Sequence, residues 1–209
     1  MSLRPILAVA VLLVAAGCAV PAPALPSGGP TSVVSVSPPA SSPATPPASP
    51  TASAPKVPDT VGGLDVSAYD VSMFASPSGA IWCAIQKDTA WCHFPGDFKG
   101  KIPSSSKVCP DQQLDVTGVS VGTKVEYFCS GDPTAFPDET NAGSGLDWFA
   151  GTGFPWVKKD GFKLATLPYG KKLAAGSFVC LSETTGVTCG NSATGIGFKM
   201  AKARVTILS

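Results

Sequence analysis

The sequence contains a single histidine, His93, and almost no charge in its first quarter. Arg4 is the only charged residue before Lys56, so this part of the chain differs from ordinary globular protein. The whole chain is nearly neutral, with a formal net charge of +1 from 15 Lys and Arg against 14 Asp and Glu. A single imidazole excludes a multi-histidine metal site. The lack of a basic surplus excludes binding of nucleic acid by bulk attraction to phosphates.

The apolar run near the start of the chain is too short to span a bilayer. It extends from Ile6 to Ala16, which is 11 residues, whereas a transmembrane helix needs about 20. A short apolar run preceded by one positive residue is typical of a secretory signal peptide. We therefore expect the chain to be exported from the cytoplasm.

The run ends in Val14-Ala-Ala-Gly-Cys18, which resembles the bacterial lipobox. The resemblance implies that residues 1–17 are removed and that Cys18 receives a diacylglycerol, which anchors the chain to the extracytoplasmic face of the cell membrane. Ala15 departs from the Leu that is commoner at its position. The alternative is an ordinary secretory signal cut near an Ala-x-Ala sequence, with Cys18 discarded. The other six cysteines favour the lipid, because an even number suits three disulfides in an oxidising compartment and leaves Cys18 over.

Residues 18–56 read as a disordered linker behind this anchor. After Cys18 the segment is made almost entirely of Pro, Ala, Ser, Thr, Gly and Val, and it has no acidic or aromatic residue. Such a composition cannot bury enough apolar surface to offset the entropy lost on ordering. Its prolines favour extended polyproline II, at about 3.1 Å per residue. We expect a spacer between the membrane and the domain.

Residues 57–209 have the pattern of one all-β domain, an antiparallel barrel or sandwich. Short runs of alternating apolar residues are separated by Gly, Pro, Asp and Asn, and no 12-residue stretch keeps a helical period. At most a short helical turn is expected around residues 65–74. The predicted strands are 79–86, 89–94, 114–121, 123–129, 162–167, 176–182, 186–190, 195–200 and 203–208.

A weak internal repeat indicates how the cysteines pair. Cys83 and Cys92 flank a polar turn, and Cys180 and Cys189 flank another at the same separation of nine. Each segment reads as a tight hairpin that places its two sulfurs opposite each other. This leaves Cys109 to pair with Cys129. Fifteen pairings are formally available to six cysteines, and the repeat favours this local one.

The segment Phe74-Ala-Ser-Pro-Ser-Gly-Ala-Ile-Trp-Cys83 resembles the F-x-S-P-S-G-N-I-x-C opening of a six-cysteine domain of unknown function from secreted proteins and lipoproteins of actinobacteria. The resemblance continues at Leu167–Gly170, Phe178–Cys180, Gly186–Asn191 and Thr194–Phe198. It implies an extracytoplasmic, disulfide-stabilised scaffold and supplies no catalytic residue. The family usually has Asn where Ala80 stands and His where Ile196 stands, so a polar site built on these two positions is missing here.

No residue pattern indicates catalysis or a cofactor. His93 is the only candidate imidazole base, but no serine lies in a G-x-S-x-G elbow and all six domain cysteines are better used as disulfides. We therefore expect His93 to be a surface or packing residue at a strand end. The oxygen-bearing residues of one Gly- and Pro-rich loop do not match a calcium-loop spacing; they are Asp132, Asp138, Glu139, Asn141 and Asp147.

Two surface features remain candidates for binding. Four aromatic residues lie among glycines, where they either stack on a ligand or fold back and cap the open end of a barrel: Trp148, Phe149, Phe154 and Trp156. Acidic residues dominate 108–157, and basic residues dominate 158–209. If the fold keeps the two segments apart, the domain has a basic face; if the strands interleave them, its surface is mixed in charge.

Taken together, the sequence predicts a membrane-anchored lipoprotein of the cell envelope whose domain is a non-enzymatic binding or interaction module. The predicted partners are the membrane, through the lipid, and a cell-wall polymer or another envelope protein. The alternatives are a small hydrolase acting on cell-wall or lipid material, which needs a site around His93 or two carboxylates, and a carrier of an apolar ligand, which needs an apolar cavity.

Overall fold

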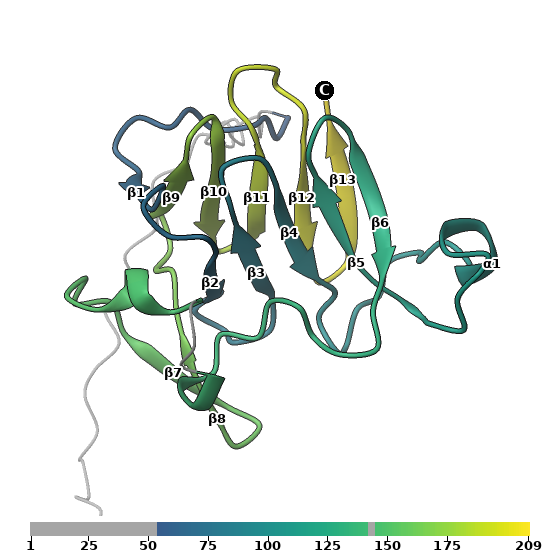
Figure 1. Cartoon of the computed structure of the whole chain (residues 1–209), viewed down its shortest axis with the longest axis horizontal. Helices are drawn as coiled ribbons and strands as arrows, with labels where there is room; N and C mark the ends of the chain where they lie inside the picture. The colour runs from purple at the N-terminus through teal and green to yellow at the C-terminus, as the bar shows by residue number, and fades with distance from the viewer. Residues whose placement is uncertain (1–53, 142–144) are drawn as a thin grey trace, which may run out of the picture. The chain divides into compact units, whose positions relative to one another are not determined.

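The computed structural model describes residues 54–141 and 145–209 (Figure 1). The compact unit that contains these residues extends from Pro50 to Ser209. The predicted signal peptide, Cys18 and nearly all of the predicted linker lie outside the described residues. Within the described part of the chain, no helix is long and apolar enough to cross a membrane.

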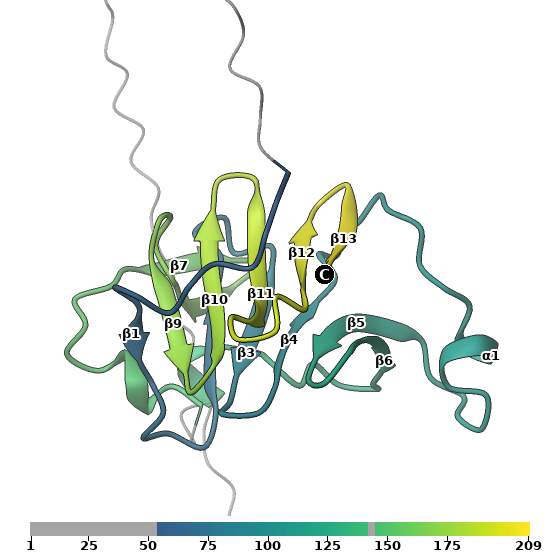
Figure 2. The same ribbon diagram turned by 90° about the horizontal axis from the view of Figure 1, so that it is seen from above.

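Two sheets packed face to face form the domain, and the views in Figures 1 and 2 both show them as two layers. The five-stranded sheet is antiparallel and consists of β2 (Ser72–Ala75), β3 (Trp82–Ile85), β4 (Ala90–His93), β5 (Val116–Val121) and β6 (Val125–Cys129), in that order. The six-stranded sheet has the order β1-β9-β10-β11-β12-β13; its strands are β1 (Leu64–Asp65), β9 (Lys172–Ala175), β10 (Phe178–Glu183), β11 (Gly186–Asn191), β12 (Gly197–Ala201) and β13 (Arg204–Leu208). Neither sheet closes on itself, so the predicted all-β fold is confirmed as a sandwich rather than a barrel.

The remaining elements are short. A separate hairpin consists of β7 (Trp156–Lys159) and β8 (Phe162–Ala165). The helical pieces are α1 (Ser105–Val108) and two single turns of 3-10 helix, η1 (Glu139–Asn141) and η2 (Asp147–Phe149). All nine predicted strands occur. In the region 65–74, where at most a short helical turn was expected, Val66 O accepts the N–H of Tyr69 at 3.1 Å in a single turn, and β2 then begins at Ser72 and pairs with β3.

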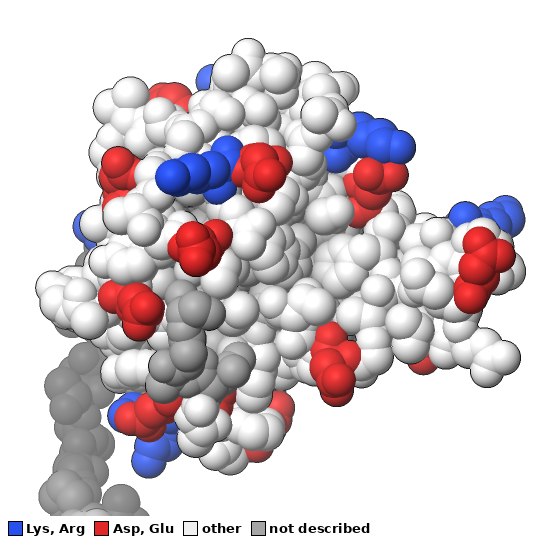
Figure 3. Space-filling model, in the orientation of Figure 1, with Lys and Arg blue, Asp and Glu red and all other residues white. Residues whose placement is uncertain are grey.

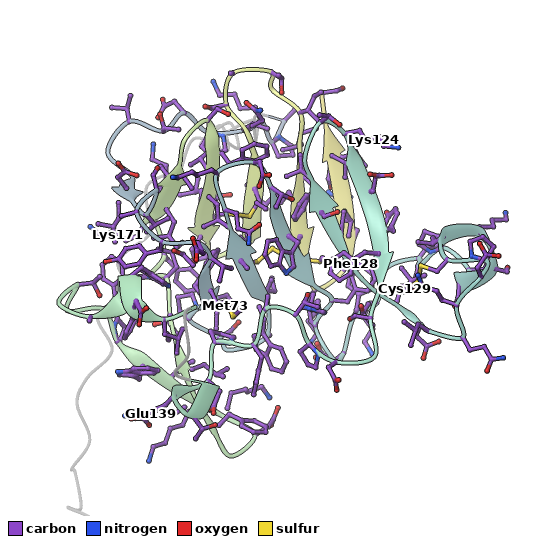
Figure 4. All side chains as sticks on the ribbon, viewed as in Figure 1. Met73, Lys124, Phe128, Cys129, Glu139 and Lys171 are labelled. Atoms are coloured by element: carbon purple, nitrogen blue, oxygen red, sulfur yellow. A yellow bond between two sulfur atoms is a disulfide. The ribbon has the colours of Figure 1, made fainter. Side chains whose placement is uncertain are left out.

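The disulfides join the strands that were predicted to pair. Cys83 lies directly opposite Cys92 on β3 and β4, and Cys180 lies opposite Cys189 on β10 and β11. The Sγ atoms of Cys92 and Cys189 are only 3.9 Å apart, so the two disulfides touch between the sheets. The third disulfide, Cys109–Cys129, ties the end of α1 to β6 at the margin of the domain (Figure 4).

The apolar core lies between the two sheets. Its largest fully buried side chains come from both layers and include Phe74 and Ile85 on one side and Leu173, Phe198 and Met200 on the other. At the N-terminal end of the described chain, residues 54–60 run across β10 and β11 (Figure 2). There Val57 packs on Gly190 and Gly197, and a Cβ on either glycine would come within 2.6 Å of it. The glycines therefore provide the space that this crossing requires.

The long connection from β6 to β7 contacts β2 and β3 of the five-stranded sheet. Met73 of β2 donates its backbone N–H to Gly145 O at 2.8 Å, and the indole of Trp148 donates to Met73 O at 3.0 Å. The ring of Phe136 packs on Trp82 with centroids 4.7 Å apart. These contacts leave open one end of the sheet, where β3 begins and β4 ends.

Candidate functional site

A cleft of about 400 Å³ lies at this open end of the five-stranded sheet. The connections that follow β4 and β6 supply its walls, together with the first residue of β3. We call it the aromatic cleft; its lining residues are Ala80, Trp82, His93, Phe94, Pro95, Gly96, Phe98, Ile102, Val116, Thr117 and Pro133. None of these side chains is an acid, a lysine or an arginine, so the cleft offers apolar contact rather than charge.

Local packing fixes the aromatic rings of the cleft. Phe94 and Phe98 stack with centroids 4.7 Å apart and ring planes 16° from parallel. A turn from Pro95 O to Phe98 N–H brings the two rings together, and the N–H of Lys99 donates to Lys202 O, which holds this connection against the β12–β13 hairpin. Both bonds are 2.9 Å long. The two hydrogen bonds therefore fix the backbone that carries the Phe94 and Phe98 rings.

Trp82 contributes an apolar ring to the cleft, and its one polar group, the indole N–H, already donates a hydrogen bond within the protein. Its indole N–H donates to Gly79 O at 2.9 Å, and its ring is held from the other side by Phe136. Ile102, at the outer rim of the cleft, is 46 % exposed. The exposed Ile102 and the rings of Trp82, Phe94 and Phe98 together form an apolar surface. In the absence of a ligand this surface is exposed to water.

His93 lies at the base of the cleft and is buried. Its Nε2 accepts the backbone N–H of Thr134 at 2.9 Å and lies 3.0 Å from Oγ1 of the same residue. Burial lowers the pKa of His93 below its usual 6.5, partly opposed by a hydrogen bond to the backbone of Thr117. The ring also meets Phe128 edge-on at 5.3 Å. The imidazole is thus neutral, with its Nε2 lone pair occupied, as expected of a packing residue at a strand end.

The acidic loop is organised by Asp138, which is only 2 % exposed. One of its oxygens accepts from the N–H and the hydroxyl of Thr140, and the other accepts the N–H of Lys163 at 3.1 Å. The Thr140 hydroxyl lowers the pKa of this carboxyl most, and backbone donors lower it further. Glu139 pairs with Lys163 Nζ at 2.7 Å. Both oxygens of Asp138 are therefore occupied by hydrogen bonds within the protein.

Among the described residues, the acidic side chains of this loop do not converge on a common point. In the described part of the chain, the one group of three metal-type side chains is formed by Cys83, Cys92 and Cys189, whose sulfurs belong to the two core disulfides. Disulfide sulfurs lack the thiolate charge that binds a metal ion.

The four aromatic residues predicted as a binding patch come together but are unequally accessible. Trp148 and Phe149 are buried, and Phe154 is partly buried against Trp148 at 6.4 Å. Trp156 is 38 % exposed, packs on Phe149 at 4.7 Å and carries Lys163 Nζ 4.9 Å above its ring. Most of this cluster thus caps the β7–β8 side of the sandwich, and only Trp156 offers an open ring.

Positive and negative side chains are interleaved on the surface. Figure 3 shows blue and red groups side by side over the visible face, with an uncharged area between them. Five of the basic residues in 158–209 form ion pairs, in the pairs Lys159–Asp160, Lys163–Glu139, Lys172–Asp59, Lys199–Glu183 and Lys202–Asp97. Of the two alternatives, the interleaved surface is the one found.

Sequence reasoning missed the aromatic cleft, although two signals pointed toward it. Phe94 and Phe98 flank a Pro-Gly pair directly after a predicted strand, and Trp82 adjoins a disulfide cysteine. The sequence did not reveal that the connection after β6 brings Pro133 into the same cleft and Thr134 against His93. A scan against protein-family models found no match, and searches of curated proteins and of solved structures found none.

Proposed function

We propose that this protein is a lipid-anchored protein of the cell envelope whose β domain binds a ligand through an apolar group and performs no catalysis. The observation that carries the proposal is the aromatic cleft, with its fixed Trp82, Phe94 and Phe98 rings and its exposed Ile102. Its volume is in the range of small-molecule sites, and a predominantly apolar lining is usual for such sites.

The state of His93 supports binding over hydrolysis. A general base must have a free lone pair within hydrogen-bond reach of the proton that it removes. In the cleft, the Nε2 of His93 already accepts the N–H of Thr134. The second nitrogen faces the backbone of Thr117. The one hydroxyl near Nε2 belongs to Thr134, the same residue whose N–H already occupies the lone pair.

The anchor rests on the sequence around Cys18. A diacylglycerol provides two acyl chains, and two chains hold a protein firmly at a membrane where one holds it only reversibly. Intact-mass measurement of the mature chain from bacterial membranes tests this part: we expect a start at Cys18 with added diacylglycerol mass, and no lipid on a Cys18→Ser chain. A mature chain that starts elsewhere without lipid would contradict the anchor.

The cleft is tested with the neutral apolar fluorophore N-phenyl-1-naphthylamine and the Cys18→Ser chain. We expect Ile102→Asp to weaken probe binding at least tenfold, because a carboxylate at the rim opposes an apolar group. The matched control is Ile207→Asp, since Ile207 is 52 % exposed and lies on β13 outside the cleft. Equal binding by both variants, or no binding by the unsubstituted cleft, would contradict the proposal.

A further inference from the structure

His93, at the base of the aromatic cleft, is bonded to the wall that contains Pro133. The N–H of Thr134 donates to Nε2 of His93 at 2.9 Å, and both His93 and Pro133 line the cleft. This N–H belongs to the peptide group that joins Pro133 to Thr134. The bond therefore fixes the orientation of the peptide group that carries the wall, so a change at Nε2 acts directly on the shape of the ligand site.

Only the neutral imidazole fits this arrangement. The second ring nitrogen of His93 hydrogen-bonds to the backbone of Thr117. A neutral imidazole has one N–H and one acceptor nitrogen, and Nε2 is the acceptor here. Protonation adds an N–H at Nε2, and this donor then faces the N–H of Thr134. Two donors do not bond to each other, so the bond to the Thr134 N–H is lost in the protonated state.

Thr134 also offers a partner to the protonated ring. Its Oγ1 lies 3.0 Å from Nε2, and a hydroxyl oxygen accepts an N–H. The backbone N–H must then turn away from the ring, because the new N–H occupies its place. The neutral and the protonated ring thus select two different orientations of the peptide group between Pro133 and Thr134. A side chain that titrates and selects between two arrangements is the basis of pH-dependent switches.

The residues that face the imidazole are uncharged in the described part of the chain. They are Trp82 on β3, Gly118 on β5 and Phe128 on β6. Four carboxyl groups lie on the surrounding elements: Asp97 and Glu126 form ion pairs with lysines, and Asp115 and Asp132 are exposed. Burial lowers the pKa of His93 below its usual 6.5. We therefore expect protonation of His93 itself to act on the wall, in mild acid below pH 6.5.

We infer that His93 is a pH switch for the aromatic cleft: the neutral ring holds the Pro133 wall in its ligand-binding position, and protonation of the ring releases the ligand. This inference rests on the proposed function, because it needs the aromatic cleft to be a ligand site. It adds how binding at that site is regulated. His93 and Thr134 are positioning residues in this switch, since they act on the ligand through the peptide group of Pro133.

The single histidine of the chain makes the switch directly observable. The untagged Cys18→Ser chain is titrated with N-phenyl-1-naphthylamine, which stays uncharged between pH 7.5 and 4.5, and the NMR signal of His93 is followed over the same range. Near-UV circular dichroism restricts the titration to conditions in which the domain is folded. We expect probe binding to be about fivefold weaker, or more, one pH unit below the midpoint of the His93 titration. Binding that is independent of pH while His93 titrates would overturn the inference.

Linkage requires the converse effect of the probe on the histidine. A ligand that prefers the neutral ring must lower the pKa of His93 by the same coupling free energy. Saturation with the naphthylamine probe is therefore expected to move the NMR midpoint of His93 to lower pH by about half a unit or more. A midpoint that does not move on saturation would overturn the inference.

Variants of the two bonded residues separate the switch from other titrating groups. His93→Gln retains an oxygen that accepts the Thr134 N–H but does not titrate, so its probe binding should not depend on pH. Thr134→Val keeps the backbone N–H and removes the acceptor of the protonated ring. The midpoints of His93 titration and of probe release should then move together to lower pH. The control is Asp132→Asn, which removes the exposed carboxyl beside Pro133 and should leave the pH dependence as it is.

Two results with these variants would overturn the inference. One is a pH dependence that persists in His93→Gln and disappears in Asp132→Asn. The other is a Thr134→Val chain whose two midpoints stay in place, and this result decides the matter even if His93→Gln does not fold.

The inference and the proposed function fail in different ways. If the naphthylamine probe binds equally well at pH 7.5 and in mild acid, the aromatic cleft remains a ligand site and the switch is wrong. If the probe does not bind the cleft at pH 7.5, the proposed function fails and the inference fails with it.

Discussion

His93 on β4 accepts the backbone N–H of Thr134, which lies 41 residues further along the chain, at an Nε2-to-N distance of 2.9 Å. This bond ties the end of β4, a core strand, to the connection between β6 and β7. An Nε2 that accepts an N–H is unprotonated, so the bond requires neutral imidazole. The position of Pro133, a wall of the aromatic cleft, therefore depends on the protonation state of His93.

We predict that the domain loses stability as the pH falls through the range in which His93 is protonated. Because the pKa of His93 is lowered in the folded protein, its contribution is complete above the unfolded value of about 6.5 and is lost as the pH falls from there through the folded pKa. Thermal unfolding between pH 7.5 and 5 measures the loss. His93→Gln should flatten the dependence, since a glutamine does not titrate. An unchanged slope in that variant would show that another group is responsible.

A second prediction concerns the contact between the two core disulfides. Removing Cys83–Cys92 by double substitution with alanine should reduce the free energy of unfolding by about 3 kcal/mol from loop opening, and by roughly 1–2 kcal/mol more for the lost buried sulfurs. Removing Cys109–Cys129 opens a longer loop, of 20 residues rather than nine, but empties no core space, so we expect a loss of about 3 kcal/mol. Urea unfolding of the two double variants gives the comparison. A smaller effect for the core pair would contradict it.

The two cysteine hairpins were predictable because each is local. A separation of nine around a polar turn determines which residues face each other, and the register has Cys83 opposite Cys92 and Cys180 opposite Cys189. β9 was not predicted, since Lys-Leu-Ala-Ala has no β-branched residue and is held as a strand by its pairing with β10 and β1. The aromatic cleft was not predictable for the same reason: its walls meet through tertiary contacts between distant loops.

A third prediction separates the structural use of Asp138 from calcium binding. Asp138→Ala removes three charge-assisted hydrogen bonds at a buried position and should lower the free energy of unfolding by about 2–3 kcal/mol. Asp132→Ala is the control, because Asp132 is exposed and should change stability by less than about 0.5 kcal/mol. Millimolar calcium should leave the melting temperature of the unsubstituted chain unchanged. A calcium-dependent rise that disappears in Asp138→Ala would show that the loop is a metal site.

The last prediction concerns Gly118, which stands between His93 and Phe128 in one cross-strand row. A Cβ at this position would come within 2.4 Å of Cys92 O and of the Phe128 ring, because the ring lies over the glycine and reaches His93 edge-on. Figure 4 shows Phe128 on β6 at this face of the sheet. Gly118→Ala must displace the ring or the β4 backbone, so we expect a loss of about 1–3 kcal/mol in the free energy of unfolding.

Gly122 provides the matched control for this substitution. It follows the same strand, and a Cβ there would have its nearest neighbour, Asp88 O, at an ordinary 3.7 Å. Gly122→Ala should therefore change stability by less than about 0.5 kcal/mol. Gly118→Ala should also weaken naphthylamine binding, because a displaced Phe128 no longer supports the ring of His93 at the base of the cleft. Urea unfolding and a probe titration of both variants decide the matter. Equal stability of the two would mean that the ring moves aside freely and that the row from His93 to Phe128 does not hold the cleft in shape.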